Sequence, residues 1–356
     1  MGSHQSEDLF LSEQGFRHAF ERGLGRLLDI GGLNLFVLVS ANASFEQTLF
    51  DNLGGRLSEL FSTLRADLCE ALVNGYRINE ADDDLLVFLK IASIGFERLA
   101  LTEHRSAGNW EVQFNHLRSF RPLRNSGRPM QSIHAPFDEQ GFHFNKPFMQ
   151  QEALWSGKML GHRIDLYYNK YPFVDLHCLL VPEREACLPQ YLNHETHTYV
   201  WRLVQHLGSS LPGVKVGYNA LGAFASVNHL HLQLFVRRRP LPVELDRWAH
   251  NGGDRDYPVG CLKFDNPDAA WAFITRLHQN NETYNLLYVP GGLYCLPRKK
   301  QGGFDLAAWS NGFSWYEMCG GMITFNHEDF TALNDQQIVT DLSLAELQDG
   351  PMFRLS

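Results

Sequence analysis

Two histidines and a glutamine alternate near the middle of the chain, in the segment 228–233. Successive side chains of a β-strand point to opposite faces, so a strand over 228–236 would put His229, His231 and Gln233 on one face and the intervening leucines on the other. Neutral imidazole is nucleophilic near pH 7, and a hydrogen bond can fix its tautomer. We therefore predict that one face is core and that the other carries His231 as a nucleophile.

The glutamine limits the reaction that such a nucleophile would serve. Attack by His231 on phosphorus would form a phosphoramidate and divide one difficult substitution into two easier ones. Gln233 can donate an amide hydrogen bond to a phosphoryl oxygen, but it cannot act as a general acid or base. An acceptor that is already anionic, such as phosphate, needs no proton removed. The pattern therefore favours transfer or phosphorolysis over hydrolysis.

His-x-His is also a spacing found among metal ligands. A zinc site needs a third and usually a fourth ligand, and the six cysteines of the chain include no Cys-x-x-Cys pair. We therefore predict no metal and no cofactor, while metal binding stays the alternative that a zinc assay would decide. The unpaired cysteines are typical of free thiols in a reducing cytoplasm.

Length and charge restrict the class of partner. The chain has 356 residues, 44% of them hydrophobic, and a net charge of −9 at pH 7, which allows more than one structural unit. An acidic chain has no general attraction to nucleic acid, so a phosphate-bearing ligand must meet a local basic pocket. The early apolar run 33–39 is too short to span a bilayer. We predict a soluble cytoplasmic protein with a small anionic partner and neither nucleic acid nor membrane.

The clearest basic segment is 118–128, where four arginines occur without an acidic residue. Arg118, Arg121, Arg124 and Arg128 could attract an anion, and the plain alternative is a solvated basic loop. The elements around the histidine segment follow from periodicity. We expect helices from 12 to about 101 and over 194–207, and strands over 163–168, 177–182, 214–219 and 229–236. Short connections between these strands indicate an antiparallel α+β layer.

A second, weaker copy of this layer follows. A helix over 269–279 precedes a hairpin over 284–297, which we compare with the strand pair at 163–182. Two related half-domains, only one of which carries the histidines, are therefore expected. The predicted division is an α-rich extension over 1–105, a catalytic half over 106–245 and a degenerate half over 246–356.

The stretch 216–233, Val-Gly-Tyr-Asn-Ala-Leu-Gly-Ala-Phe-Ala-Ser-Val-Asn-His-Leu-His-Leu-Gln, resembles the active-site stretch of the GDP-L-galactose (GDP-hexose) phosphorylases. That family belongs to the galactose-1-phosphate uridylyltransferase and diadenosine tetraphosphate phosphorylase branch of the histidine-triad superfamily. Other segments resemble it in the same order between about 110 and 320, among them 113–115, 136–138, 144–146, 179–182, 187–190, 257–260, 280–285 and 296–297.

The resemblance implies a histidine-triad-like fold of antiparallel sheets with flanking helices. It implies a GDP-hexose phosphorylase in which His231 is guanylylated, the carbonyl of His229 orients it, Gln233 holds the phosphoryl group and His177 supports the site from behind. The implied substrates are a GDP-sugar and inorganic phosphate. The implied substrate-binding residues, whose plain alternatives are turn-capping and surface charge, are Asn219, Ser226, Asn228, Lys146 and Arg118.

Two segments depart from the family pattern. Segment 31–98 has no counterpart, and Gly320 and Gly321 stand where the pattern expects a histidine. Neither the sugar nor the base can be read from the residues, so a dinucleoside polyphosphate phosphorylase and a hexose-1-phosphate nucleotidylyltransferase stay open. A non-catalytic nucleotide sensor is the alternative from another class. The oligomeric state is also open, although exposed strand edges would favour a homodimer.

Overall fold

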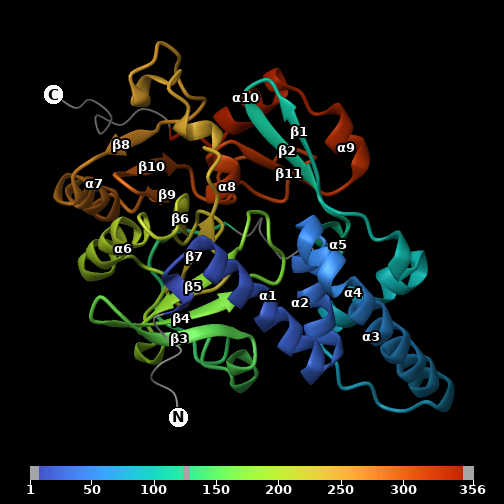
Figure 1. The fold of residues 1–356 in the computed structure, drawn as a ribbon. Coiled ribbons are helices and arrows are strands. Elements are labelled where there is room, and N and C mark those ends of the chain that lie inside the picture. The colour runs from blue at the N-terminus through green and yellow to red at the C-terminus, as the bar shows by residue number, and fades with distance from the viewer. Residues whose placement is uncertain (1–7, 123–128, 348–356) are drawn as a thin grey trace.

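The computed structural model describes residues 8–122 and 129–347. The N-terminal part is helical, as predicted, and Figure 1 shows α2, α3 and α4 gathered beside the main sheet. Ser12 begins α1 by accepting a hydrogen bond from the Gly15 amide, and Gly75, in the left-handed region, ends α3. These helices are α1 (Glu13–Ile30), α2 (Leu33–Ala43), α3 (Gln47–Asn74) and α4 (Asp82–Ile94).

An eight-stranded antiparallel sheet forms the centre of the molecule, in the order β3-β4-β5-β7-β6-β9-β10-β8. The predicted α+β class with antiparallel strands and an N-terminal helical part is therefore confirmed. The strands are β3 (Ala153–Met159), β4 (His162–Tyr168), β5 (Cys178–Pro182), β6 (Val214–Asn219), β7 (Leu232–Val236), β8 (Leu262–Phe264), β9 (Thr283–Val289) and β10 (Gly292–Arg298).

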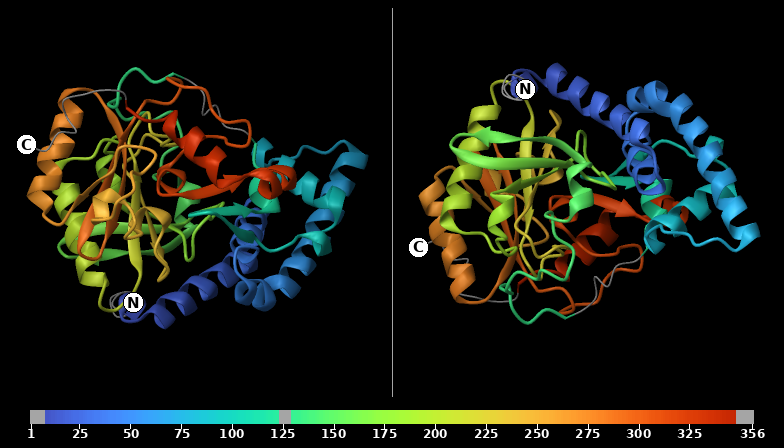
Figure 2. Two further views of the ribbon diagram at one scale, coloured as in Figure 1. Left: turned by 90° about the horizontal axis from the view of Figure 1, so that it is seen from above. Right: turned by 90° about the horizontal axis from the view of Figure 1, so that it is seen from below.

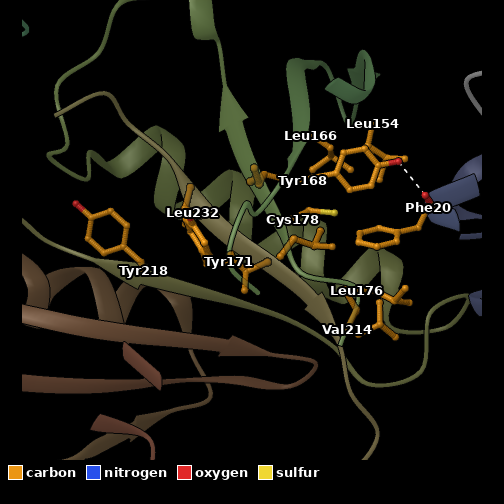
Figure 3. Packing of buried hydrophobic residues seen from close by; sticks show 14 of the residues in the cluster. Phe20, Leu154, Leu166, Tyr168, Tyr171, Leu176, Cys178, Val214, Tyr218 and Leu232 are labelled. Atoms are coloured by element: carbon orange, nitrogen blue, oxygen red, sulfur yellow. Dashed lines mark hydrogen bonds between the residues drawn. The ribbon is translucent and has the colours of Figure 1, made fainter. Parts of the chain in front are cut away.

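One face of this sheet packs against helices. The amphipathic helices α6 (His194–Leu207) and α7 (Pro267–Gln279) share a single apolar cluster with that face and with α1 and α2. Figure 3 shows part of this cluster, in which the Tyr168 hydroxyl of β4 donates a hydrogen bond of 2.9 Å to the Phe20 carbonyl of α1. The N-terminal helices are thus packed into the same core as the sheet.

A smaller layer covers part of the other face, on the β9–β10 side. It contains the three-stranded sheet β1-β2-β11, in which β11 runs parallel to β2, and Figure 2 shows this sheet beside the large one. A second apolar cluster joins the small sheet to Phe235, Leu287 and Leu296 of the large one. The elements of this layer are β1 (Glu103–Ala107), β2 (Trp110–Phe114), β11 (Gly321–Thr324), α8 (Trp315–Met318), α9 (His327–Ala332) and α10 (Asp335–Ser343), while the short α5 (His116–Phe120) follows β2.

The strand order reveals how the two halves correspond. The sequence β5-α6-β6-β7 is repeated as β8-α7-β9-β10, and the two sets meet where β6 pairs with β9, so that β5-β7-β6 mirrors β8-β10-β9. The hairpin β9–β10 therefore corresponds to β6–β7. Our comparison with the strand pair at 163–182 is wrong, because alternating apolar hairpins look alike and only the preceding helix identifies the right partner. Where the domain boundaries fall stays a prediction.

The histidine strand is shorter than predicted. It begins at Leu232 instead of His229, because the amides of Leu230 and His231 bond to Leu188 and Gln190 and not to a neighbouring strand. Leu230 is nevertheless buried in the same cluster as the leucines of β7, so the predicted apolar face is present. Similarly, β5 begins at Cys178, one residue after His177. No helix of the described residues is long and apolar enough to cross a membrane.

Candidate active site

His231 lies at the entrance to β7 and is held there by Gln190. The Gln190 side chain accepts a 2.9 Å hydrogen bond from the His231 amide and donates to the carbonyls of His231 and Asn219, at 3.0 and 2.9 Å. The side chain of Gln190 is fully buried, so these bonds are shielded from water. Gln190 thus fills the gap where β6 and β7 separate and fixes the backbone on both sides of it.

The hydrogen bonds of His231 determine its tautomer. Its Nδ1 lies 2.8 Å from the His229 carbonyl, which can only accept, so Nδ1 carries the proton. Burial lowers the pKa of His231 to about 4, and the ring is therefore neutral at pH 7. No described residue bonds to Nε2. The site thus presents one nitrogen with a free lone pair, on a ring whose orientation is fixed by its own backbone.

His229 has a different environment. Its Nδ1 accepts from the Phe144 amide at 3.1 Å and its Nε2 donates to the Arg184 carbonyl at 3.0 Å. Burial lowers its pKa to about 4, so this ring is also neutral at pH 7. The side chain of His229 therefore joins three segments of chain, and binding a metal would break one of these two bonds. Among the described residues no group of three His, Cys, Asp or Glu has metal-binding geometry.

Gln233 is oriented by two donors. The indole Nε1 of Trp315 and Nε2 of His177 both lie 2.9 Å from the Gln233 Oε1 atom. An indole nitrogen only donates, so the atom facing it must be the amide oxygen, and His177 must carry its proton on Nε2. Burial lowers the pKa of His177 to about 3, in agreement with a neutral ring. The Gln233 amide nitrogen bonds to no described residue and is left to donate.

Asn219 is oriented in the same way. Its Oδ1 accepts from Asn285 Nδ2 and from the backbone amide of Trp315, both at 2.7 Å. The backbone amide only donates, which again identifies the facing atom as oxygen and leaves Nδ2 as the outward donor. Extending the β6–β7 register by two residues puts Asn219 beside His231. Gln233 and Asn219 therefore each have an amide nitrogen left to donate, on the face of the sheet that carries His231.

Trp315 serves both amides because β6 leaves room for its ring. A Cβ atom at Gly217, which pairs with Gln233, would lie 2.4 Å from the indole ring of Trp315. Any larger residue at Gly217 would push the indole away from Gln233. The Gly320–Gly321 step that departs from the family pattern has a similar origin, since a Cβ at Gly321 would lie 2.2 Å from the Tyr316 ring. Close packing thus explains why positions 217 and 321 are glycines.

Arg118 and Lys146 lie near the site in different settings. Arg118 donates a 2.6 Å bond to the Tyr171 carbonyl and stacks 4.7 Å from the ring of Phe173, which itself contacts His177. Burial lowers the pKa of Arg118 to about 10. Lys146 is half-buried, and its Nζ bonds to the Glu139 carbonyl. Of the other arginines in this segment, Arg121 lies over the Tyr171 ring, and Arg124 and Arg128 fall outside the described residues.

Ser226 and Asn228, on the turn before His229, differ from each other. Ser226 is exposed. Asn228 donates to the carbonyls of Ala135 and Pro136, at 3.4 and 2.7 Å, and accepts from the Gln190 amide at 3.0 Å. Its side chain therefore holds segment 135–136 against the histidines. A direct substrate contact stays a prediction for both residues.

Three residues that position the site escaped prediction from the sequence. Gln190 lies in segment 187–190, which resembles the family, so the resemblance could have indicated this residue. Trp315 and Asn285 lie far away in the chain and reach the site only because β6 pairs with β9. Asn285 lies in segment 280–285, which resembles the family, but nothing in the sequence relates either residue to the histidines.

Comparison with known proteins agrees with this geometry. Residues 106–235 match the family model of the GDPGP1-like N-terminal domain. The GDP-D-glucose phosphorylase 1 of Danio rerio is 40% identical over 123 residues, which are 34% of this chain and 35% of that protein. The GDP-L-galactose phosphorylase 2 of Arabidopsis thaliana is 28% identical over 259 residues, 59% of each chain. The chain thus matches only about a third to three fifths of the length of these relatives.

A solved structure matches over a longer stretch. The yeast Ap4A phosphorylase Apa2 superposes with a TM-score of 0.52 at 15% identity, covering 78% of this chain and 99% of that one. At this identity the match concerns the fold, and it agrees with the predicted histidine-triad-like architecture. Over residues 106–235 the chain is thus similar to the GDPGP1-like family, and over parts of its length it is similar to GDP-D-glucose and GDP-L-galactose phosphorylases.

Proposed function

We propose that this protein is a GDP-hexose phosphorylase, a nucleotidyltransferase that converts a GDP-hexose and inorganic phosphate into GDP and a hexose 1-phosphate. The observation that carries the proposal is a neutral His231 whose Nε2 bonds to no described residue, on the same face of the sheet as two amides that each have a nitrogen left to donate. The activities of the sequence relatives supply the identity of the donor. The fixed rings and amides supply the chemistry.

In the first step, Nε2 of His231 attacks the α-phosphorus of the GDP-hexose. The bond from the α-phosphorus to the bridging oxygen breaks, and hexose 1-phosphate leaves with the electron pair. The imidazole becomes positively charged as the nitrogen–phosphorus bond forms, and the His229 carbonyl, 2.8 Å from Nδ1, stabilises that charge. The amide nitrogens of Gln233 and Asn219 donate to the non-bridging oxygens as their negative charge grows.

In the second step, an oxygen of inorganic phosphate attacks the guanylyl-histidine, and GDP leaves with His231 restored. A phosphate monoester is a good leaving group and phosphate is an anionic nucleophile, so neither step requires a general acid or base. A glutamine, which cannot transfer a proton, is therefore sufficient at position 233. Lys146 and Arg118 are proposed to neutralise the phosphates, and Ser226 and Asn228 to line the turn beside them.

A dinucleoside polyphosphate phosphorylase is the second candidate, favoured by the fold shared with the yeast Ap4A phosphorylase. The first step would be the same, with a mononucleotide transferred to His231 and a nucleoside polyphosphate leaving. A hexose-1-phosphate nucleotidylyltransferase would share it too, with a sugar phosphate as acceptor. These activities differ in the groups that bind the base and the leaving group, and not in the histidine.

The test is a covalent trap combined with a substrate panel. The protein is incubated without phosphate in GDP-, ADP- and UDP-sugars and in dinucleoside polyphosphates, and its mass is measured. We expect one guanylyl group on His231 from a GDP-hexose, and its release as GDP when phosphate is added. Turnover without a histidine adduct would overturn the covalent mechanism, and adducts only from dinucleoside polyphosphates would select the second candidate. Tight binding without any product would instead indicate a nucleotide sensor.

The cellular setting and assembly belong to the same proposal. Six free cysteines suit a reducing cytoplasm. The end strands β3 and β8 leave backbone groups on their outer sides unpaired within the described residues, which suits pairing of two copies as a homodimer. Light scattering on the purified protein tests the assembly, and a monomeric mass at micromolar concentration would contradict it.

A further inference from the structure

Arg298, at the end of β10, is a buried cation. Its side chain is fully buried, and none of the described carboxylates forms a salt bridge with it. Burial lowers its pKa to about 9, so the guanidinium still carries its charge at pH 7. The buried carboxylate of Glu317 raises the pKa of Arg298 through space but forms no salt bridge with it. Desolvating a charge without a directly bonded counterion is unfavourable, and proteins that keep such a group commonly use it.

The guanidinium contacts one side chain of β9, two backbone carbonyls and an aromatic ring on the connection that leads to His231. Its NH1 donates to Asn285 Oδ1 at 3.2 Å and to the Phe313 carbonyl, and its Nε donates to the Lys299 carbonyl. Its NH2 is buried without a partner. The ring of Phe224, on the turn that leads to His231, lies 5.0 Å from the guanidinium. Of these contacts, only the hydrogen bond to Asn285 leads through further hydrogen bonds toward His231.

That contact is the first bond of a chain of amides. The arginine only donates, so it must face the oxygen of Asn285, and the Ala223 carbonyl, 3.2 Å from Asn285 Nδ2, independently requires nitrogen there. Asn285 Nδ2 then donates 2.7 Å to Asn219 Oδ1. Each amide accepts on one side and donates on the other, and the last donor is Asn219 Nδ2, beside His231.

We propose that Arg298 is a positioning residue for the reaction at His231: it orients and polarises Asn219 through Asn285, so that the second half strengthens a donor of the first. The inference rests on the proposed function. Within a low-dielectric interior, successive hydrogen bonds polarise one another, and a cation at the start of the chain makes the final N–H a stronger donor. Asn285 and Asn219 lie on one rung of the sheet where the two halves meet, since β6 and β9 pair them directly.

The series of hydrogen bonds from Arg298 to Asn219 should act mainly on the transition state. Negative charge on the non-bridging oxygens grows as the histidine attacks, so a stronger donor lowers the barrier more than it tightens substrate binding. Removing one such donor typically costs about 10²- to 10³-fold in rate, and weakening it should cost less. We expect Arg298→Met to slow adduct formation about 10- to 100-fold while the KM for the nucleotide changes little.

Three variants separate this role from a structural one. Arg298→Lys keeps the charge and should retain more of the rate than Arg298→Met. Phe224→Leu removes one of the two aromatic rings over the guanidinium, the other being Phe304, but leaves the amide chain intact, and it should have little effect. Arg237→Met is the matched control, because it removes another well-buried guanidinium, paired with Glu111 after β7, that donates to neither Asn285 nor Asn219. Equal losses in all of these variants would overturn the proposal.

A double-mutant cycle tests whether Arg298 acts through Asn285. Asn285→Leu breaks the chain, so adding Arg298→Met to it should cost nothing further in the single-turnover rate of adduct formation. Losses that multiply would contradict the relay. A rate unchanged by Arg298→Met, in protein whose melting temperature shows it folded, would contradict it too.

The closing measurement needs no reaction. With ¹⁵N-labelled asparagine and the Asn219 signal assigned by an Asn219→Ser variant, we expect the Nδ2 protons of Asn219 to shift upfield in Arg298→Met and in Asn285→Leu, but not in Phe224→Leu. An Asn219 signal that is unchanged in the first two variants overturns the relay even if His231 is guanylylated. A shifted signal without any adduct on His231 keeps the relay and overturns the proposed function.

Discussion

The two halves of the large sheet share one frame and use it differently. In β6 and β7, Gly217 pairs with Gln233, and on the same rung of the sheet Leu287 of β9 pairs with Tyr294 of β10. On the next rung His231 precedes β7 at one end, and Leu296, paired with Asn285, lies at the other end. The second half thus has apolar and aromatic side chains at the far ends of the rungs on which the first half has its polar groups.

The connection before the last strand explains the difference. Residues 220–231 join β6 to β7, whereas only residues 290–291 join β9 to β10. The long connection lets the chain separate from β6 at Asn219, where Gln190 enters and His231 turns its Nδ1 to the backbone. A tight hairpin keeps Leu296 inside the ladder and the core. The two halves therefore differ mainly in the connection 220–231, and not in the strands that it joins.

The largest effect should come from removing the nucleophile of the first half. His231→Asn takes away the atom that attacks phosphorus, and loss of a nucleophile costs about four to six orders of magnitude in kcat. The adduct detected by mass spectrometry should also disappear. His250→Asn is the matched control, since that histidine also bonds to a carbonyl, of Val243, but lies outside the site. A His231→Asn variant with near-normal turnover would contradict the reactive role of this half.

The next effect compares Gln233 with Tyr294, which lies on the same rung of the sheet. Gln233→Glu still accepts from Trp315 and His177 but replaces the outward N–H with a carboxylate oxygen that repels phosphate. Losing one such donor costs about 10²- to 10³-fold in kcat. Tyr294→Phe loses only the hydroxyl bond to Asn251 and should keep the wild-type kcat. Steady-state kinetics of both variants checks this, and comparable losses would mean that the halves are not functionally distinct.

The sequence predicted those parts of the molecule whose information is local. Helix α6 and strand β6 have the predicted bounds, 194–207 and 214–219, because their apolar periodicity is strong and ends at clear breaks. The alternation at 229–233 was equally local, and it predicted one buried face, which the leucines form, and one face for chemistry. The geometry of His231, with Nδ1 on the His229 carbonyl, follows from two adjacent positions.

The parts that escaped prediction depend on distant pairing. Strand β11 pairs in parallel with β2, more than half the chain away, and neither strand alternates strongly. Trp315 reaches Gln233 only because Gly217 leaves space for its ring. Arg298 shows no sign of its role in the sequence, since a basic residue at a strand end is typical of an exposed edge. Such contacts follow from register across the sheet, which a single sequence does not encode locally.

A third prediction compares how Leu296 and His231 contribute to the stability of the fold. Leu296 is fully buried in the second apolar cluster, and truncating such a side chain costs about 2–5 kcal/mol of unfolding free energy. Leu296→Ala should therefore lower the denaturant midpoint strongly, while the folded protein keeps the wild-type kcat at saturating substrate. His231→Asn should do the reverse, with activity lost and the midpoint little changed. Loss of kcat in folded Leu296→Ala would contradict the division between a supporting and a reactive half.

The smallest effect is the dependence of stability on pH. Burial holds the pKa of His231 at about 4, below the ordinary 6.5, so the unfolded chain binds a proton first as the pH falls. The stability that the neutral ring allows is complete above about pH 6.5 and is lost toward pH 4, by about 2 kcal/mol between pH 7 and pH 5. Urea unfolding at several pH values should show a shallower loss in His231→Asn. Leu296→Ala removes no titrating group, so its plot of unfolding free energy against pH should lie lower than that of the wild type but parallel to it. Equal slopes in all three proteins would show that His231 is not buried as a neutral ring.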